Sequence, residues 1–140
     1  MSTCFQSQFH IETSGRGVRE ITSEINHSLA ESEIETGIAH IFLKHTSASM
    51  MLCENADPTV LQDMETFVSQ LVPDGASEYL HNYEGDDDMP AHIRSVLTSN
   101  DLSIPITNGV LNLGVWQGVF LYEHRYQAHR RNLVITALGN

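Results

Sequence analysis

The stretch LSIPITNGVLNL, residues 102–113, predicts a β-hairpin and with it the kind of sheet that this chain forms. Asn108-Gly109 is the preferred pair for a two-residue type I′ turn, because both central residues of that turn need a positive φ. The flanking segments 102–106 and 110–113 are rich in aliphatic residues and read as its strands. A tight hairpin joins antiparallel strands, so we expect an antiparallel or mixed sheet.

Residue patterns on both sides of the hairpin predict the remaining elements. Further strands are expected at 5–12, 37–45, 115–122 and 133–138. A first helix is expected where Val18, Ile21, Ile25 and Leu29 recur at helical spacing. After a polar loop, Asp57 and Pro58 predict the cap and first position of a second helix, which is lined by Val60, Leu61, Met64, Phe67, Val68 and Leu71. Asp88 and Pro90 begin a third helix, in which we expect Ile93, Val96 and Leu97 to be buried.

These elements define an α+β protein. About six strands and three helices, with the last strands consecutive, predict a mostly antiparallel or mixed sheet with helices packed on it. The 140 residues suit one domain spanning 1–140. The sequence has no apolar run of about 20 residues that would span a bilayer, and residues 1–10 do not resemble a secretory signal, so the expected location is cytoplasmic.

The charge balance limits the partners. Seven basic and 18 acidic residues give a formal net charge of −11 at pH 7. A chain this acidic repels phosphate backbones, so we expect no nucleic-acid partner, and no basic amphipathic helix indicates a membrane surface. A cation site fits the acidity, and a bound cation can accept a phosphorylated ligand. Cys4 and Cys53 are the only cysteines and read as small hydrophobic residues.

Histidine and carboxylates are concentrated in three segments: HTSAS at 45–49 with ENAD at 54–57, HNYEGDDDMPAH at 81–92, and GVWQG at 114–118 running on to EHR at 123–125. Each segment has a histidine at or near the end of a predicted element. Asp88 and His92 are four residues apart at a helix start and can share a face. Histidines from separate segments are typical of an open zinc-type site. Alternatively, Asp86, Asp87 and Asp88 suit Mg²⁺.

The same three segments, HTSASMMLCENAD (45–57), HNYEGDDDMPAH (81–92) and GVWQGVFLYEHR (114–125), resemble the signature blocks of the YjbQ family in the order of that family. The resemblance implies an α+β sandwich-like fold, a homotrimer, and a divalent metal, with zinc favoured, on histidines. Carried over by position, the metal ligands are His45, His92 and His124, with His81 as the alternative third ligand. The polar cluster of the family, our candidate catalytic set, falls on Glu54, Asp57, Glu84, Asp86, Asp88, Glu123 and Arg125.

The resemblance also implies a reaction, a secondary thiamin phosphate synthase activity. That transferase reaction joins hydroxymethylpyrimidine diphosphate to a thiazole phosphate and releases diphosphate, so it needs a cation such as Mg²⁺ and donors for phosphate. The candidate substrate-binding residues are Thr46, Ser47, Ser49, Trp116 and Gln117, with Arg125 as a further phosphate donor. Two alternatives remain open: a metal-dependent hydrolase, and a non-enzymatic trimer with a structural metal.

Overall fold

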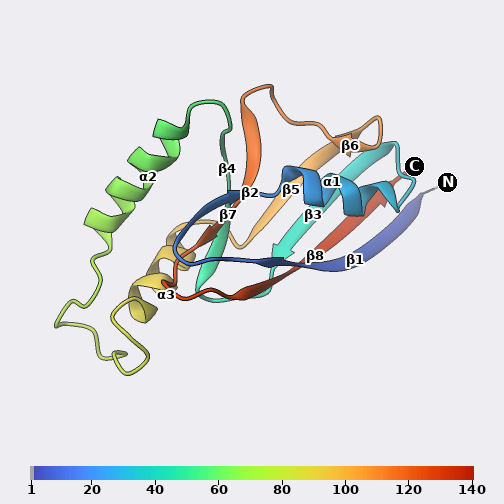
Figure 1. Ribbon diagram of the computed structural model, residues 1–140. Helices are drawn as coiled ribbons and strands as arrows, with labels where there is room; N and C mark the ends of the chain where they lie inside the picture. Colours follow the sequence, from blue (N-terminus) through green and yellow to red (C-terminus); the bar gives the residue numbers. More distant parts are fainter. Residues whose placement is uncertain (1) are drawn as a thin grey trace.

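Two antiparallel sheets form the body of the protein in the computed structural model, which describes residues 2–140 (Figure 1). The elements are β1 (Thr3–Glu12), β2 (Gly17–Glu20), α1 (Thr22–Ala30), β3 (Thr36–Leu43), β4 (Ala48–Glu54), α2 (Pro58–Leu71), α3 (Asp88–Leu97), β5 (Asp101–Thr107), β6 (Val110–Leu111), β7 (Gln117–Glu123) and β8 (Arg130–Gly139). The strand order is β1-β8-β3-β5-β6 in the larger sheet and β2-β7-β4 in the smaller one.

The main core lies between the two sheets and α1. Inward residues of the large sheet, such as Ile41 and Ile135, meet Met50 and Leu121 from the small sheet. The other face of the small sheet carries Tyr122, whose hydroxyl reaches Glu65 of α2. The helices α2 and α3 therefore cover the face that points away from the core, and the long loop 72–87 between them lies at one end of the molecule (Figure 1). This α+β architecture confirms the predicted fold class.

The predicted hairpin is confirmed, and two strands were not predicted. Asn108 and Gly109 have φ values of 54° and 76°, as a type I′ turn requires. The segment predicted as a polar loop after residue 45 contains β4, which pairs with β7 from Ala48–Glu123 to Glu54–Gln117. Val18 lies in β2, not in the first helix, which begins at Thr22. Pairing with β7, a partner that is distant in sequence, outweighs the weak local pattern of both strands.

The expected burial of Val96 and Leu97 in α3 was wrong, although α2 and α3 begin where the sequence predicted. No residue of α2 is buried, and Val96 and Leu97 of α3 are exposed. The reason is that the inner faces are polar: Arg94 is fully buried and donates to Glu65 (3.0 Å) and to Ser69 (3.2 Å). No helix within residues 2–140 is long and apolar enough to cross a membrane.

Candidate metal centre

Two histidines and one carboxylate converge where the loop 72–87 meets α3. The Nε2 atom of His81 lies 2.6 Å from Asp88 Oδ2, and the Nε2 atom of His92 lies 3.4 Å from the same oxygen. Within residues 2–140 this is the one group of three histidine, cysteine or acidic side chains whose ligand atoms all lie within 4.8 Å of one another. Asp88 is buried and the two imidazoles are half-buried, so solvent reaches the group from one side.

The orientation of His92 suits a metal ligand. Its Nδ1 atom lies 3.0 Å from the carbonyl oxygen of Thr46, which can only accept, so Nδ1 carries the proton. In that tautomer the Nε2 lone pair faces Asp88 Oδ2, another acceptor. Two facing acceptors repel each other unless a proton or a metal ion lies between them. An Nδ1–H bond to a backbone carbonyl is also the usual support of a histidine metal ligand.

Arg125 fixes the carboxylates around this group. Its guanidinium donates to Asp88 Oδ1 (2.6 Å), to Asp87 Oδ2 (2.9 Å) and to the carbonyl oxygen of Glu84 (2.9 Å). Burial raises the pKa of Asp88, but the hydrogen bond from His81 and the charge of Arg125 lower it by more than burial raises it. The pKa of Asp88 is therefore below its ordinary value. The carboxylate is therefore ionised and ready for a cation at neutral pH. The sequence predicted that Arg125 binds phosphate, but in the structure its guanidinium is occupied by these carboxylates.

The structure does not bring His45 and His124 together with His92. The Nε2 atom of His45 accepts a hydrogen bond from the backbone N–H of Asn132 (2.7 Å), and its Nδ1 atom faces the Arg131 guanidinium at 3.4 Å. His124 is fully buried directly after β7, with Nε2 2.8 Å from Ser49 Oγ. The alternative ligand His81 is the histidine that joins His92. Sequence spacing did not reveal that His45 bonds to Asn132 and faces Arg131, or that His124 is buried with Nε2 bonded to Ser49 and Nδ1 without a hydrogen-bond partner among residues 2–140.

Several predicted site residues serve the fold instead. Glu123 is buried against Arg131 and accepts from Thr13 Oγ1 (2.8 Å). Ser47 lies in the same network and accepts from Arg131 at 3.0 Å, and Ser49 is fully buried, so neither hydroxyl is free for a substrate. A buried ion pair with satisfied partners is a structural arrangement, and we remove Glu123 from the catalytic candidates.

A second set of predicted residues lies far from the histidine group. Glu54 pairs with Gln117 at one end of β4 and β7, and Ala48 pairs with Glu123 at the other end. Six residues of strand separate these pairs, which corresponds to about 20 Å. Trp116 is exposed beside the Glu54 end, and Asp57 caps α2 by accepting from Thr59 N (2.9 Å). Within one chain, this end cannot share a small ligand with the histidine group.

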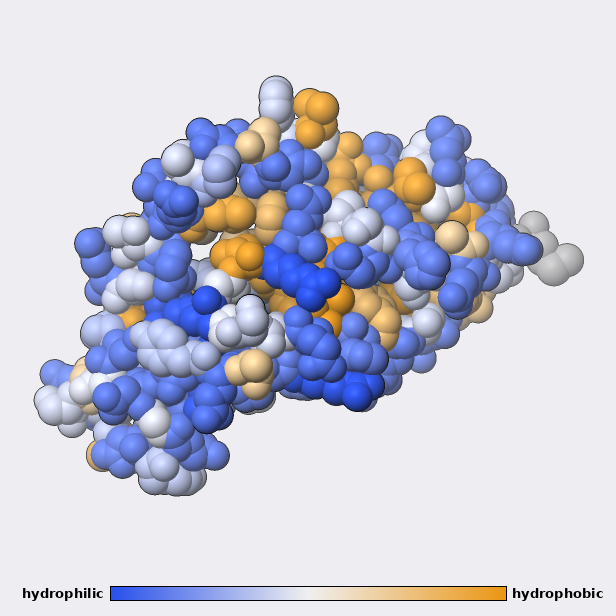
Figure 2. Space-filling model, viewed as in Figure 1, coloured by the Kyte–Doolittle hydropathy of each residue, from blue (hydrophilic) through white to orange (hydrophobic). Residues whose placement is uncertain are grey.

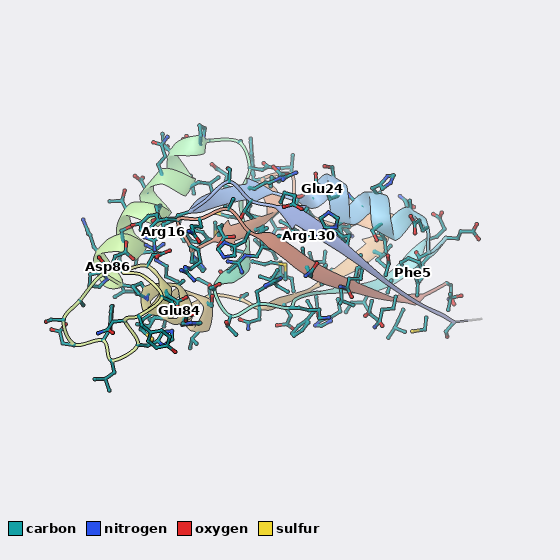
Figure 3. The ribbon with its side chains drawn as sticks, turned by 60° about the horizontal axis from the view of Figure 1, so that its bottom comes forward. Phe5, Arg16, Glu24, Glu84, Asp86 and Arg130 are labelled. Carbon is teal, nitrogen blue, oxygen red and sulfur yellow. The ribbon has the colours of Figure 1, made fainter. Side chains whose placement is uncertain are left out.

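Glu84 and Asp86 do belong to the neighbourhood of the histidine group. Figure 3 shows both residues at the end of the molecule that carries the loop 72–87, with Arg16 nearby and Phe5 close to the other end. The exposed Glu84 carboxylate lies 3.1 Å from His81 Nε2, while Asp86 is exposed on the loop. A cavity of about 270 Å³ opens beside them, lined by residues that include Tyr79, His81 and Asn82. The group thus adjoins space for a small polar ligand.

These features define a class: an α+β protein of two antiparallel sheets with a solvent-accessible histidine–carboxylate group of metal-site type at a helix start. The family model for UPF0047 protein YjbQ-like matches residues 7–140, and the chain belongs to this family. A UPF0047 protein of Synechocystis sp. is 48% identical over 92% of this chain and 88% of its own. UPF0047 protein YjbQ of Escherichia coli O157:H7 is 41% identical over 96% and 98%.

Solved structures are similar over the whole fold. A YbjQ-like protein of unknown function from Sulfolobus solfataricus P2 superposes with a TM-score of 0.89, 23% identity and full coverage of both chains, which shows the fold. An uncharacterized conserved protein of the yjbq/upf0047 family from Clostridium acetobutylicum has a TM-score of 0.84 at 30% identity, covering 94% of this chain and 98% of its own.

Proposed function

We propose that this protein is a metal-dependent enzyme acting on a small phosphorylated molecule, with the thiamin phosphate synthase reaction as an activity. The observation that carries the proposal is the convergence of His81, Asp88 and His92. Two imidazoles and one carboxylate are a usual ligand set for zinc and leave coordination positions open for substrate or water. A divalent ion held there would neutralise charge that develops on departing phosphate oxygens.

The residues of the chain itself have limited means of binding phosphate. The Arg125 guanidinium is occupied by Asp87, Asp88 and the Glu84 carbonyl. Thr46 and Lys44 remain as exposed donors, and Thr46 is next to the group because its carbonyl holds His92. Substrate phosphates would therefore depend mainly on the bound cation, in keeping with the acidic surroundings.

Turnover of the two thiamin precursors tests the proposed reaction. Purified protein with Mg²⁺ or Zn²⁺ is expected to release diphosphate and form thiamin phosphate, and Asp88→Asn is expected to lower kcat/KM on the order of 100-fold, because it removes the shared carboxylate. His40→Ala is a matched control, since His40 pairs with Asp101 on the exposed face of the large sheet. Absence of turnover by the wild-type protein would contradict the synthase assignment, and equal turnover by the wild-type protein and Asp88→Asn would contradict the role given to Asp88.

Glu84 favours a second candidate, a metal-dependent hydrolase. Its carboxylate is half exposed and lies 3.1 Å from a candidate ligand atom, so it is placed to accept a proton from a water molecule at the group. A panel of phosphoesters, amides and lactones, assayed with wild type and Glu84→Gln, separates the two reactions. Hydrolysis that is lost in Glu84→Gln would favour the hydrolase.

The expected homotrimer finds support in α2. Met64, Phe67 and Leu71 form an apolar stripe at helical spacing on the side of α2 opposite Glu65, and Phe67 is 63% exposed. Figure 2 shows a mostly hydrophilic face, with further apolar surface between α2 and the rest of the protein. A stripe of this kind on a helix without buried residues is suited to contact with another copy of the chain.

Light scattering on the purified chain tests this assembly. The wild-type protein is expected to have three times the mass of one chain, and Phe67→Asp is expected to dissociate it, because a carboxylate at the centre of the stripe would be buried without a partner. Thr66→Asp introduces the same charge outside the stripe and should leave the mass unchanged. A wild-type monomer would refute the trimer.

A further inference from the structure

A second cluster, away from the candidate ligands, ties the loop 72–87 to the rest of the protein. The Arg16 guanidinium donates two hydrogen bonds to the Asp74 carboxylate, at 2.7 Å and 2.9 Å, and its Nε donates to the carbonyl oxygen of His124 (2.9 Å). The hydroxyl of Tyr126 also bonds to Asp74, and the Arg16 guanidinium lies over the Tyr126 ring at 4.2 Å. We call Arg16, Asp74 and Tyr126 the clasp.

The clasp is more tightly built than a surface ion pair. The Arg16 side chain is only 8% exposed, and its fork-to-fork contact with Asp74 has the preferred geometry for arginine and carboxylate. Arg16 comes from the turn between β1 and β2, which is distant in sequence from the loop that it holds. Isolated exposed ion pairs contribute little to stability, whereas a buried guanidinium that binds a carboxylate with two hydrogen bonds and stacks on an aromatic ring is fixed in one geometry.

Both ends of the loop meet at Tyr126. Its hydroxyl bonds to Asp74 at the beginning of the loop, and its backbone N–H donates to Asp87 Oδ2 (2.8 Å) at the end. Between these points Gly75 N donates to the carbonyl oxygen of Asp86 (3.0 Å). Gly75 has φ +63°, and a Cβ there would lie 3.1 Å from the Asp86 carboxyl carbon, so a larger residue would strain this closure.

The closed loop carries one of the two histidines of the candidate centre. His81 lies within the segment between Gly75 and Asp86, and His92 lies on α3 outside it. Outside the candidate centre, the contacts of His81 are with its own loop: it touches Tyr83 and Glu84 there, and its other two contacts are with Asp88 and His92 of the centre itself. The position of His81 relative to Asp88 therefore depends on how the ends of the loop are held.

We propose that Arg16, Asp74 and Tyr126 are positioning residues for the metal centre, which hold the loop so that His81 meets Asp88 and His92. This inference rests on the proposed function, since it assumes that the centre binds a metal ion. Groups that orient metal ligands without touching the metal typically affect affinity by about 10- to 100-fold. A ligand on a tied loop also loses less conformational freedom on binding than a ligand on a free loop.

Zinc affinity of the full chain, measured by competition with a chromophoric chelator, tests the clasp. Arg16→Lys keeps the positive charge but removes the bidentate guanidinium, and Asp74→Asn removes the charged acceptor. Each variant is expected to weaken zinc binding about tenfold or more. Arg19→Ala is the matched control, because Arg19 lies in the adjoining strand β2 and donates only to the carbonyl oxygen of Glu12 (3.0 Å). It should bind zinc like the wild-type protein.

A double-mutant cycle distinguishes positioning of His81 from a general loss of structure. His81→Ala should cost much less affinity in the Arg16→Lys background than in the wild type, because the clasp variant has already displaced that ligand. His92→Ala should cost the same in both backgrounds, since the His92 ring is held by the carbonyl oxygen of Thr46 and makes no contact with Arg16. Tyr126→Phe removes the hydroxyl of an exposed residue, which donates to Asp74 and accepts from Arg16. It should weaken binding only a few-fold and serves if Arg16→Lys does not fold.

The outcomes separate the two proposals. Wild-type zinc binding that is unchanged by Arg16→Lys, Asp74→Asn and Tyr126→Phe overturns the clasp and leaves the metal centre standing. Equal costs of His81→Ala in both backgrounds likewise overturn it. Absence of zinc binding by the wild-type protein overturns the proposed function and the clasp together.

Discussion

Replacing His92 by alanine is expected to weaken binding of a divalent metal by on the order of 100-fold or more. Loss of a direct ligand lowers the affinity more than loss of a residue that only orients a ligand. His92 offers Nε2 to the space shared with Asp88, while its Nδ1 is held by Thr46. His81→Ala is expected to act similarly. Isothermal titration of metal-free protein with Zn²⁺ measures both effects directly.

His45→Ala is the decisive control for the assignment of ligands. The resemblance placed His45 among the ligands, whereas in the structure its Nε2 is occupied by the N–H of Asn132. We therefore expect His45→Ala to lower stability and to leave the zinc affinity at the wild-type value. A large loss of affinity in His45→Ala, with none in His81→Ala, would restore the original ligand set and contradict the present one.

Acid is expected to destabilise the protein well above the pH at which carboxylates become protonated. Burial lowers the pKa of His124 to about 3, with the Arg94 charge as the next cause and a smaller opposing effect from Glu123. The unfolded chain binds this proton near pH 6.5, so it holds more protons than the native state below that pH. The free energy of unfolding should therefore fall by about 1.4 kcal/mol per pH unit between about pH 6 and pH 4.

Denaturant titrations between pH 7 and pH 4.5 measure this slope, and His124→Gln should reduce it. His45, whose pKa is also lowered by burial and next by Arg131, contributes in the same direction and accounts for a remaining slope in the variant. An NMR titration of His124 in the native protein gives an independent result: its ring should stay neutral down to about pH 4. A midpoint near 6.5 for that ring would refute this explanation.

Local sequence signals predicted the elements that depend on local chemistry. Asn108-Gly109 specifies its turn because the backbone conformation belongs to those two residues, and Asp57-Pro58 specifies a helix start for the same reason. The strand β4 was missed because its stability comes from pairing with β7, which is more than sixty residues away in sequence. The polar inner face of α3 was missed because Arg94 is paired with Glu65, and no short-range pattern reveals that pair.

The residues of the candidate site likewise fall into those that local spacing predicted and those that it did not. Asp88 and His92 were predicted to share a helix face, and the i, i+4 geometry brings them together. Which of His45, His81 and His124 joins His92 depends on the direction of the side chains in a loop and at the end of a strand. Residue spacing cannot determine those directions. The clasp gave no signal at all, because Arg16 and Asp74 lie in segments with no motif.

The most direct test of the metal centre is anomalous diffraction at the zinc edge from crystals grown with one equivalent of Zn²⁺ per chain. We predict one peak per chain at about 2.0–2.2 Å from Nε2 of His81, Nε2 of His92 and a carboxylate oxygen of Asp88. A peak at His45 or His124, or none beside Asp88, would contradict the account.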